Sequence, residues 1–358
     1  MTPTVLILSC PQDLHAHAVC EAIERKGGSR ALILYTTDFP SRAGLTVIPD
    51  GRRPTLAWKA AEKWRLDGNY ASVWVRRTFF ATTPGEFDEQ DRLTIERECR
   101  EMRRAFLSLL CPRAMWVNPL RSEAGKAAQL AVAASLGFEI PPTLVSNDPA
   151  EILAFVQRAR TAVVFKTFSA AVPTTIVTPE ILADPDLLRW TPGIYQHYVP
   201  KAYELRATVI GRRIFTVKIN SQETLRGRID WREAQRRPRG KAADLTFEPT
   251  VLPGAVAERC LHLMQSLGLV YGAIDLIVTP EDEHVFLEVN PAGQFLWAES
   301  EAGLPLLDAL STMLIEGRPD YRFNISYPVV RFDSSLERAA EARQRHSMKR
   351  HVCDLRGW

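Results

Sequence analysis

The stretch "VFLEVNPAGQFLW" (residues 285–297) carries an acid and an amide within an otherwise apolar strand pattern. Side chains two residues apart on a strand point to the same face, so Glu288 and Asn290 are expected to project together. Leu287 and Val289 are expected to project to the opposite face. The pattern therefore predicts a site at which one carboxylate and one carboxamide meet.

A second acid lies in the apolar stretch "YGAIDLIV" (residues 271–278), just upstream. A turn at residues 280–283 makes a hairpin that brings Asp275 beside Glu288. Two carboxylates and the Asn290 amide form a hard oxygen set that suits Mg²⁺, which proteins hold with one or two carboxylates and substrate phosphates. Taken singly, Asp275 is equally explained as a paired core acid and Glu288 as a solvent-facing strand residue. Burying both without partners would be costly.

Two lysines precede this hairpin in the chain. Lys126 is predicted in the first turns of a helix with Ser122 as its N-cap, and Lys166 ends the strand "AVVFK". A lysine presents a point charge on a long apolar stem, so both are candidates to contact an oligophosphate.

The stretch "IYQHYV" followed by "PKAYEL" (residues 194–205) predicts a strand, a proline-marked hinge and a second strand. We expect backbone groups at Gln196, Tyr198 and Val199 to hold an adenine. Glu204 is placed to accept a hydrogen bond from a ribose hydroxyl. Arg206, on the same strand face as Glu204, is expected to reach the transferred phosphate.

Composition excludes several classes of protein. The 358 residues allow two or three domains, and the six cysteines are scattered without a C-x-x-C pair, which favours reduced thiols in the cytoplasm. No run approaches the roughly 18 apolar residues of a membrane span. A net charge of +3 gives no electrostatic argument for nucleic acid. We therefore expect neither a membrane nor a nucleic-acid partner.

The N-terminal third has the pattern of an α/β unit: a strand "TVLILSC", a helix closed by Gly27 and Gly28, and a strand "ALILYTT". It lacks a G-x-G-x-x-G turn, so a dinucleotide site there is disfavoured. A strand ending at Arg76 and Arg77, which we expect to be structural, precedes a long amphipathic helix. A β-hairpin is predicted around Gly211.

Lys126, Lys166, "YQHYVPKAYELR", "AIDLIV" and "FLEVNPAG" together resemble the ATP-grasp fold over about residues 120–310. More narrowly, "WVRRTFF", "WVNPLRSEAGKAAQLAVAASLGFEIPPTLVSND", "ELRATVIG" and "IDWR" resemble the microviridin-type peptide cyclases, the graspetide ligases. This resemblance implies an α/β (α+β) architecture with ATP bound between its last two domains. It implies a pre-ATP-grasp domain at 1–118, a central subdomain at 119–198, a C-terminal subdomain with the metal site at 199–325, and a basic tail at 326–358.

The resemblance also implies an activity: ATP and Mg²⁺ convert Asp or Glu side chains of a ribosomal precursor peptide into acyl phosphates. Ser, Thr or Lys side chains of the same peptide then close the ester or amide rings. Arg206, Lys218 and Arg232 are the implied catalytic residues. The implied partner is a leader plus an acidic core, and a homodimer is the default for a soluble enzyme of this size.

The segment from Arg212 to Lys241 contains ten Lys or Arg against three acids, an excess of seven. Such a run is typical of a solvated face. The resemblance offers a second interpretation, in which the run steers an acidic peptide through bidentate arginine contacts. Beside Lys218 and Arg232, its candidates are Arg212, Arg213, Arg226 and Arg228.

Two alternatives share these residues. Another ATP-grasp ligase would add amino acids to a peptide or protein terminus, so its product gains a residue instead of losing water. A non-catalytic scaffold would bind nucleotide or peptide, but it has no need of the full metal set. Two departures from the family pattern are the segment "TFSAAVPTT", which lacks the glycines of a phosphate-covering loop, and the neutral Gln294, where an acid is expected.

Overall fold

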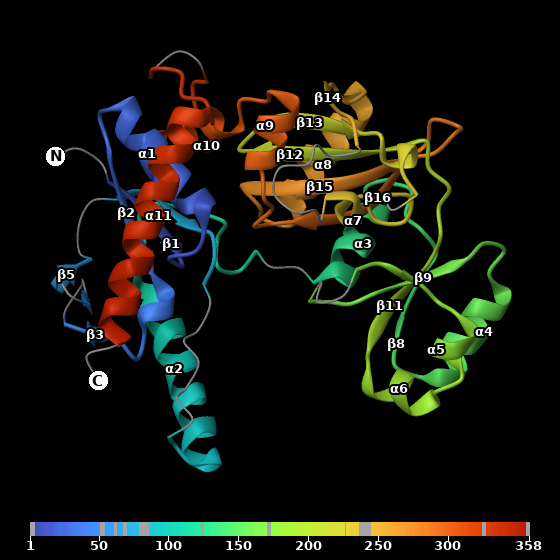
Figure 1. Ribbon diagram of the computed structural model, residues 1–358, viewed down its shortest axis with the longest axis horizontal. Coiled ribbons are helices and arrows are strands. Elements are labelled where there is room, and N and C mark those ends of the chain that lie inside the picture. The colour runs from blue at the N-terminus through green and yellow to red at the C-terminus, as the bar shows by residue number, and fades with distance from the viewer. Residues whose placement is uncertain are drawn as a thin grey trace.

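The computed structural model describes residues 4–50, 54–60, 63–66, 70–78, 86–122, 125–169, 173–225, 227–235, 245–323 and 327–355. These residues form four β-sheets with helices packed around them (Figure 1). The predicted α/β class is confirmed by this arrangement.

The N-terminal sheet is parallel, in the order β2-β1-β6-β7. Its strands are β1 (Thr4–Ser9), β2 (Arg30–Tyr35), β6 (Tyr70–Val75) and β7 (Met115–Val117). Both faces of β1 are covered, which explains its unbroken apolar sequence: Val5 and Ile7 pack against one set of helices, Leu6 and Leu8 against another cluster.

Helices from both chain ends cover one face of this sheet. They are α1 (Leu14–Lys26), α10 (Leu306–Glu316) and α11 (Ser334–Leu355). Gly27 (φ 69°) ends α1, as the sequence predicts, and Asp13 caps its N-terminus. The C-terminal tail is the helix α11, and Arg343 ties it to α1 by an ion pair with Glu24 at 2.6 Å. The tail thus completes the N-terminal layer.

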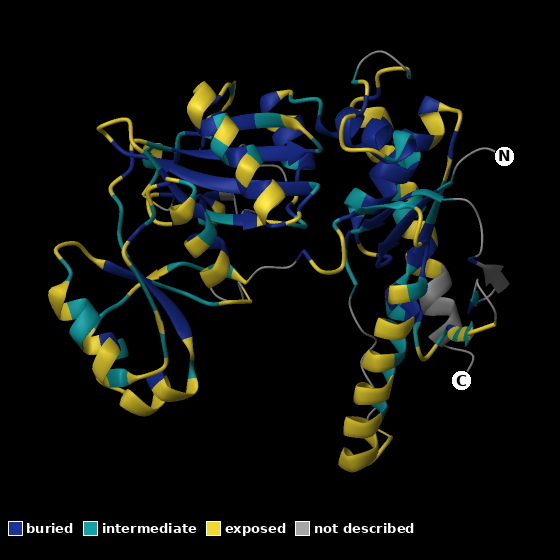
Figure 2. Cartoon of the chain, turned by 180° about the vertical axis from the view of Figure 1, so that it is seen from behind, coloured by how far each residue is buried: buried dark blue, intermediate teal, exposed yellow. Residues whose placement is uncertain are grey.

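The other face of the N-terminal sheet packs on Phe106 of α2 (Glu89–Leu109) and on a small antiparallel sheet. The sequence patterns described above do not predict this small sheet. That sheet contains β3 (Gly44–Ile48), β4 (Thr55–Lys59) and β5 (Lys63–Arg65), in this order. Most of α2 projects away from the sheet and is exposed (Figure 2).

The central sheet has the order β10-β9-β11-β8 and is antiparallel. Its strands are β8 (Thr143–Ser146), β9 (Val163–Lys166), β10 (Thr175–Ile176) and β11 (Gly193–His197). Its core joins Ile152, Leu188 and Tyr195. Three helices accompany it: α4 (Pro149–Arg158), α5 (Pro179–Leu182) and α6 (Pro185–Trp190).

The largest sheet is antiparallel, in the order β14-β13-β12-β15-β16. Its strands are β12 (Tyr203–Ile210), β13 (Arg213–Ile219), β14 (Phe247–Thr250), β15 (Tyr271–Val278) and β16 (His284–Asn290). Around it lie α3 (Lys126–Ser135), α7 (Trp231–Gln235), α8 (Gly254–Ser266) and α9 (Leu296–Ala302). The hairpin at Gly211 is confirmed; this glycine has φ 61°, and a Cβ there would lie 2.1 Å from the Pro319 carbonyl oxygen.

One predicted cap is wrong. The helix that carries Lys126 begins at Lys126 itself, and Gly125 occupies the N-cap position. Ser122 instead donates a hydrogen bond to the Pro119 carbonyl three residues earlier in the chain. None of the helices in the described part of the chain has the length and apolar character that a membrane span requires.

Candidate active site

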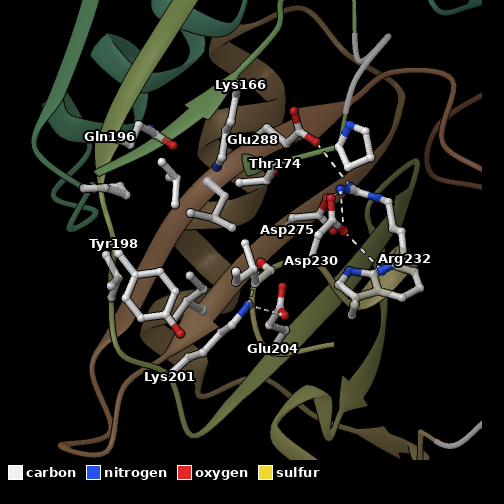
Figure 3. A pocket seen from close by; sticks show the side chains of 18 of the residues that line it. Lys166, Thr174, Gln196, Tyr198, Lys201, Glu204, Asp230, Arg232, Asp275 and Glu288 are labelled. Carbon is white, nitrogen blue, oxygen red and sulfur yellow. Dashed lines mark hydrogen bonds and ion pairs between the residues drawn. The ribbon is translucent and has the colours of Figure 1, made fainter. Parts of the chain in front are cut away.

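A pocket lies between the central sheet and the largest sheet (Figure 3). Strands β9 and β11 contribute Lys166 and Gln196 from one side, while β15 and β16 contribute Asp275 and Glu288 from the other. Most of the residues that the sequence predicts for nucleotide and metal binding, together with the predicted catalytic Arg232, line this one pocket: Lys126, Lys166, Gln196, Tyr198, Val199, Glu204, Arg232, Asp275, Glu288 and Asn290.

The acidic hairpin is built as predicted, with one difference. Asp275 pairs directly with Glu288 across β15 and β16. The next pair is Leu276 with Phe286, so Leu287 is an extra, bulged residue. Leu287 lines the pocket beside Glu288, whereas Val289 is buried on the opposite side. The expectation that Leu287 faces away is therefore wrong, because the bulge shifts the alternation by one residue.

Two arginines hold Asp275. Arg206, which lies opposite Asp275 on β12, donates from Nη1 to both carboxylate oxygens at 2.6 and 2.7 Å. Arg232 reaches over from α7, and its Nη2 lies 2.8 Å from Asp275 Oδ2 and 3.3 Å from Glu288 Oε1. Burial lowers the pKa of Arg232, but Asp275, Asp230 and Glu288 outweigh it and raise that pKa. Arg232 thus stays charged between the two acids.

Glu288 also contacts a predicted phosphate ligand. Lys126 Nζ lies 3.1 Å from Glu288 Oε2. Burial alone would raise the pKa of Glu288, but Lys126, Arg232 and Lys166 together lower it, so the carboxylate is ionised. Burial lowers the pKa of Lys166, against an opposing contribution from Glu288. Lys126 in contact with the Glu288 carboxylate, with Lys166 lining the same pocket, is an arrangement that could also bind a phosphate.

The donor set fits Mg²⁺. Asp275 and Glu288 face each other, and Asn290 Oδ1 accepts one hydrogen bond, from the Ala292 amide at 3.0 Å. In the described ranges no group of three or more His, Cys, Asp or Glu is arranged to hold a metal ion, so the amide has to complete this set. Five acids and four Lys or Arg line the pocket, so an oligophosphate gains from an accompanying divalent cation.

The hinge between β11 and β12 has an ion pair that sequence reasoning missed. Lys201 Nζ lies 2.6 Å from Glu204 Oε1 and also donates to the Ile229 carbonyl at 3.2 Å. Burial raises the pKa of Glu204, and Lys201 opposes this effect. The predicted ribose acceptor therefore has a charged partner within the chain. The sequence signal that could have predicted this ion pair is the lysine three residues before Glu204 in "PKAYEL".

The other hinge residues are held by local contacts. Gln196 is buried and donates to the Thr143 hydroxyl at 3.0 Å, and the Tyr198 amide donates to the Ala162 carbonyl at 2.7 Å. Their roles in adenine binding stay predictions.

Several predicted peptide-side residues lie outside the pocket lining. Lys218 sits over the Tyr203 ring, 4.9 Å from its centroid, and 3.7 Å from Glu248. Arg213 stacks on the Tyr321 and Phe323 rings. Arg212, in the hairpin turn, donates its amide to the Pro319 carbonyl, and the carbonyl of Arg228 accepts from the Tyr198 hydroxyl at 3.4 Å. Arg226 falls outside the described residues.

None of the free cysteines in the described part of the chain has the lowered pKa of a nucleophilic thiol. Burial raises the pKa of Cys20, Cys111 and Cys260 to about 12, so these thiols stay protonated.

Comparison with known proteins agrees with this geometry. Residues 4–124 match the model of the MvdD pre-ATP grasp domain. The crystal structure of macrocyclase MdnC of Microcystis aeruginosa MRC, bound with precursor peptide MdnA, is 32% identical, with a TM-score of 0.75. The match covers 87% of this chain and 99% of MdnC. The chain belongs to the graspetide-type family of ATP-grasp peptide ligases.

Two further structures resemble this ligase over their whole length. The RiPP-associated ATP-grasp ligase of Chryseobacterium gregarium, in complex with ADP and a leader and core peptide, is 26% identical with a TM-score of 0.73. That match covers 92% of this chain and 99% of the other. Macrocyclase MdnB of Microcystis aeruginosa MRC is 27% identical with a TM-score of 0.72, over 88% of this chain and 100% of MdnB. A search of curated proteins gives no match. The predicted family, fold and enzyme class are confirmed.

Proposed function

We propose that this ligase closes ester or amide rings between side chains of a ribosomally made precursor peptide, using ATP and Mg²⁺. The observation that supports it most is the full-length similarity to MdnC, a macrocyclase solved with a precursor peptide. The pocket adds a chemical reason, because it brings Lys126, Lys166, Arg232 and the Asp275–Glu288 pair together.

The first step is activation of a peptide carboxylate. One oxygen of an Asp or Glu side chain attacks the γ-phosphorus of ATP, the bond to the β-phosphate oxygen breaks, and ADP leaves. Such transfers depend mainly on positioning and on neutralising charge. Lys126 and Lys166 supply positive charge to the phosphates, and Glu204 with the strand β11 hinge binds the nucleoside.

The second step closes the ring. A Ser or Thr hydroxyl or a Lys amine attacks the carbonyl carbon of the acyl phosphate, loses its proton, and phosphate leaves. Each ring therefore costs one ATP and removes one water from the peptide. A bound Mg²⁺ would neutralise phosphate charge, with Asp275, Glu288 and Asn290 as its protein ligands.

Arg232 is the proposed contact for the reacting peptide carboxylate. Its side chain is 43% exposed at the pocket while its guanidinium lies among acids, so it faces both the metal ligands and solvent. Arginine binds carboxylates in a bidentate fashion, which would orient the attacking oxygen. Arg206 is buried and its Nη1 donates to both oxygens of Asp275, so we propose that it acts by orienting that carboxylate.

The test is the intact mass of a candidate acidic precursor after incubation with the ligase and Mg-ATP. Loss of about 18 Da per ring, dependent on ATP and absent for Glu288→Gln, is the expected result. Gain of an amino-acid mass when free amino acids are supplied would favour a terminal ligase. Peptide binding without any mass change would favour a scaffold. We further propose that the ligase is a cytoplasmic homodimer. Size-exclusion chromatography with light scattering tests the dimer, and cell fractionation tests the location.

A further inference from the structure

The segment 291–296, which joins β16 to α9, is bonded by side chains from distant parts of the chain. Three consecutive backbone carbonyls each accept from a different side chain. These bonds run from Asn118 Nδ2 to Pro291 at 2.9 Å, from Arg76 Nη1 to Ala292, and from the Tyr271 hydroxyl to Gly293 at 2.7 Å. Two backbone amides of the same segment, those of Phe295 and Leu296, donate to His15 Nε2 at 3.2 and 3.4 Å.

Two of these four side chains, Arg76 and His15, form one buried cluster with Asp13 in the N-terminal layer. Arg76 Nε lies 3.3 Å from Asp13 Oδ2, and both residues are at most 4% exposed. The other Asp13 oxygen lies 3.6 Å from His15 Nδ1. Because Nε2 of His15 accepts two amides, its proton is on Nδ1, facing Asp13. The cluster therefore fixes the imidazole and guanidinium in the orientations that hold the segment.

The segment touches the proposed metal site at two points. The Ala292 amide donates to the Asn290 side-chain oxygen at 3.0 Å. A Cβ on Gly293 would lie 2.6 Å from Ala273 Cβ and 3.0 Å from Arg206 Nη2, so this backbone packs directly against the guanidinium that holds Asp275. A shift of the segment would displace Asn290 and crowd or release Arg206.

A buried ion pair is an inefficient way to stabilise a fold, since apolar side chains of similar volume often do as well or better. The Arg76–Asp13 pair instead fixes an orientation. Asp13 orients the Arg76 guanidinium, and Arg76 donates to one particular carbonyl, that of Ala292. Among the described residues, Arg76 Nη2 has no hydrogen-bond partner and Nε makes only the ion pair with Asp13, so full hydrogen bonding of a buried arginine does not explain its presence.

We propose that Arg76, oriented by Asp13, is a positioning residue that fixes the segment 291–296 and through it Asn290 and Arg206 for binding of Mg²⁺ and nucleotide. Tyr271 bonds the Gly293 carbonyl of the same segment, and His15 accepts from its Phe295 and Leu296 amides. The proposal rests on the use of Mg-ATP in the proposed function, but it does not depend on which peptide is modified.

The test compares Arg76→Met and Arg76→Lys with a matched control, Lys26→Met. Lys26 also makes a buried ion pair, to Asp308 at 2.5 Å, with both side chains at most 2% exposed, but it does not contact the segment 291–296. Two measurements are made on each variant. Amide hydrogen exchange is followed in a peptide covering the segment in the ligand-free protein, and calorimetry gives the affinity for a non-hydrolysable ATP analogue with and without Mg²⁺.

For Arg76→Met we expect faster exchange at the Phe295 and Leu296 amides and a loss of Mg²⁺-dependent nucleotide affinity of about 10-fold to 100-fold, the range typical of residues that orient metal ligands. Arg76→Lys should recover part of the affinity, because an ammonium group also donates to the Ala292 carbonyl. Lys26→Met should lower thermal stability without changing either measurement.

Unchanged affinity in Arg76→Met, or an equal loss in Lys26→Met, would overturn the proposal. If Arg76→Met does not fold, Tyr271→Phe removes a single hydroxyl that donates to the Gly293 carbonyl of the same segment, and it should also lower the affinity. Wild-type affinity in Tyr271→Phe would also overturn the proposal. The calorimetry uses no peptide. Normal nucleotide binding by the wild type without ring closure would therefore count against the proposed function alone.

Discussion

Replacing Asp13 with asparagine should make the stability of the protein less dependent on pH between 7 and 3. Burial alone would raise the pKa of Asp13, but the contact with His15 and the charge of Arg76 lower it from 3.8 to about 2. A depressed folded-state pKa stabilises the fold above the unfolded pKa, and this contribution is lost as pH falls through the folded pKa. Ionised Asp13 thus contributes to stability at neutral pH.

The magnitude follows from the shift. A difference of 1.8 pH units (3.8 minus about 2) corresponds to about 2.4 kcal/mol at pH 7, of which about 1.1 kcal/mol is lost by pH 3. For a chain of this size that is a Tm difference of about 3 °C at pH 7 from this contribution, falling to about half near pH 3. Asparagine also serves as an N-cap, so the helix α1 cap itself is retained.

Calorimetric melting of wild type and Asp13→Asn at pH 7, 5, 4 and 3, at one ionic strength, measures the effect. Asp148→Asn is the control, because Asp148 caps α4 through the Ala150 amide but is exposed. Its Tm difference should be within about 1 °C at every pH. An Asp13→Asn difference that stays constant from pH 7 to pH 3 would refute the assignment of a depressed pKa to Asp13.

Three further predictions concern the pocket. Glu288→Gln combined with Asn290→Ala should abolish ring closure, measured as peptide mass loss, while the circular dichroism spectrum is unchanged; wild-type turnover would exclude both as metal ligands. Arg232→Glu should weaken peptide binding more than ATP binding in parallel titrations, and equal weakening would place Arg232 at the nucleotide. Lys201→Met leaves Glu204 buried without its cation and should cost about 3–5 kcal/mol of stability. Lys201→Met with Glu204→Gln should regain most of that loss, and no recovery would show that the pair is not coupled.

The basic residues proposed to bind the peptide show which structural features a run of charge does not predict. A run of like charges indicates an exposed basic segment, but it does not say which way each side chain points. Arg213 packs on two aromatic rings and Lys218 over a third, whereas Arg232 contacts the pocket acids Asp275 and Glu288. The difference is set by which loop or strand each residue occupies, and that depends on tertiary packing.

The sequence by itself determined the features that short-range geometry controls. The turn at residues 280–283 placed Asp275 beside Glu288, the glycine at 211 predicted a hairpin, and Gly27 marked the end of a helix. These features depend on residues close together in the chain, so local patterns suffice to predict them. The motifs around the pocket also carried the family resemblance.

Only the tertiary structure decided the contacts that join distant residues. The bulge that turns Leu287 into the pocket is a property of how two strands pair. The bond from Arg76 to the Ala292 carbonyl spans 216 residues, and nothing near either residue in the sequence specifies the other. Burial then gives these groups their altered pKa values and their directional roles, because a buried charge has only the partners that the fold brings to it.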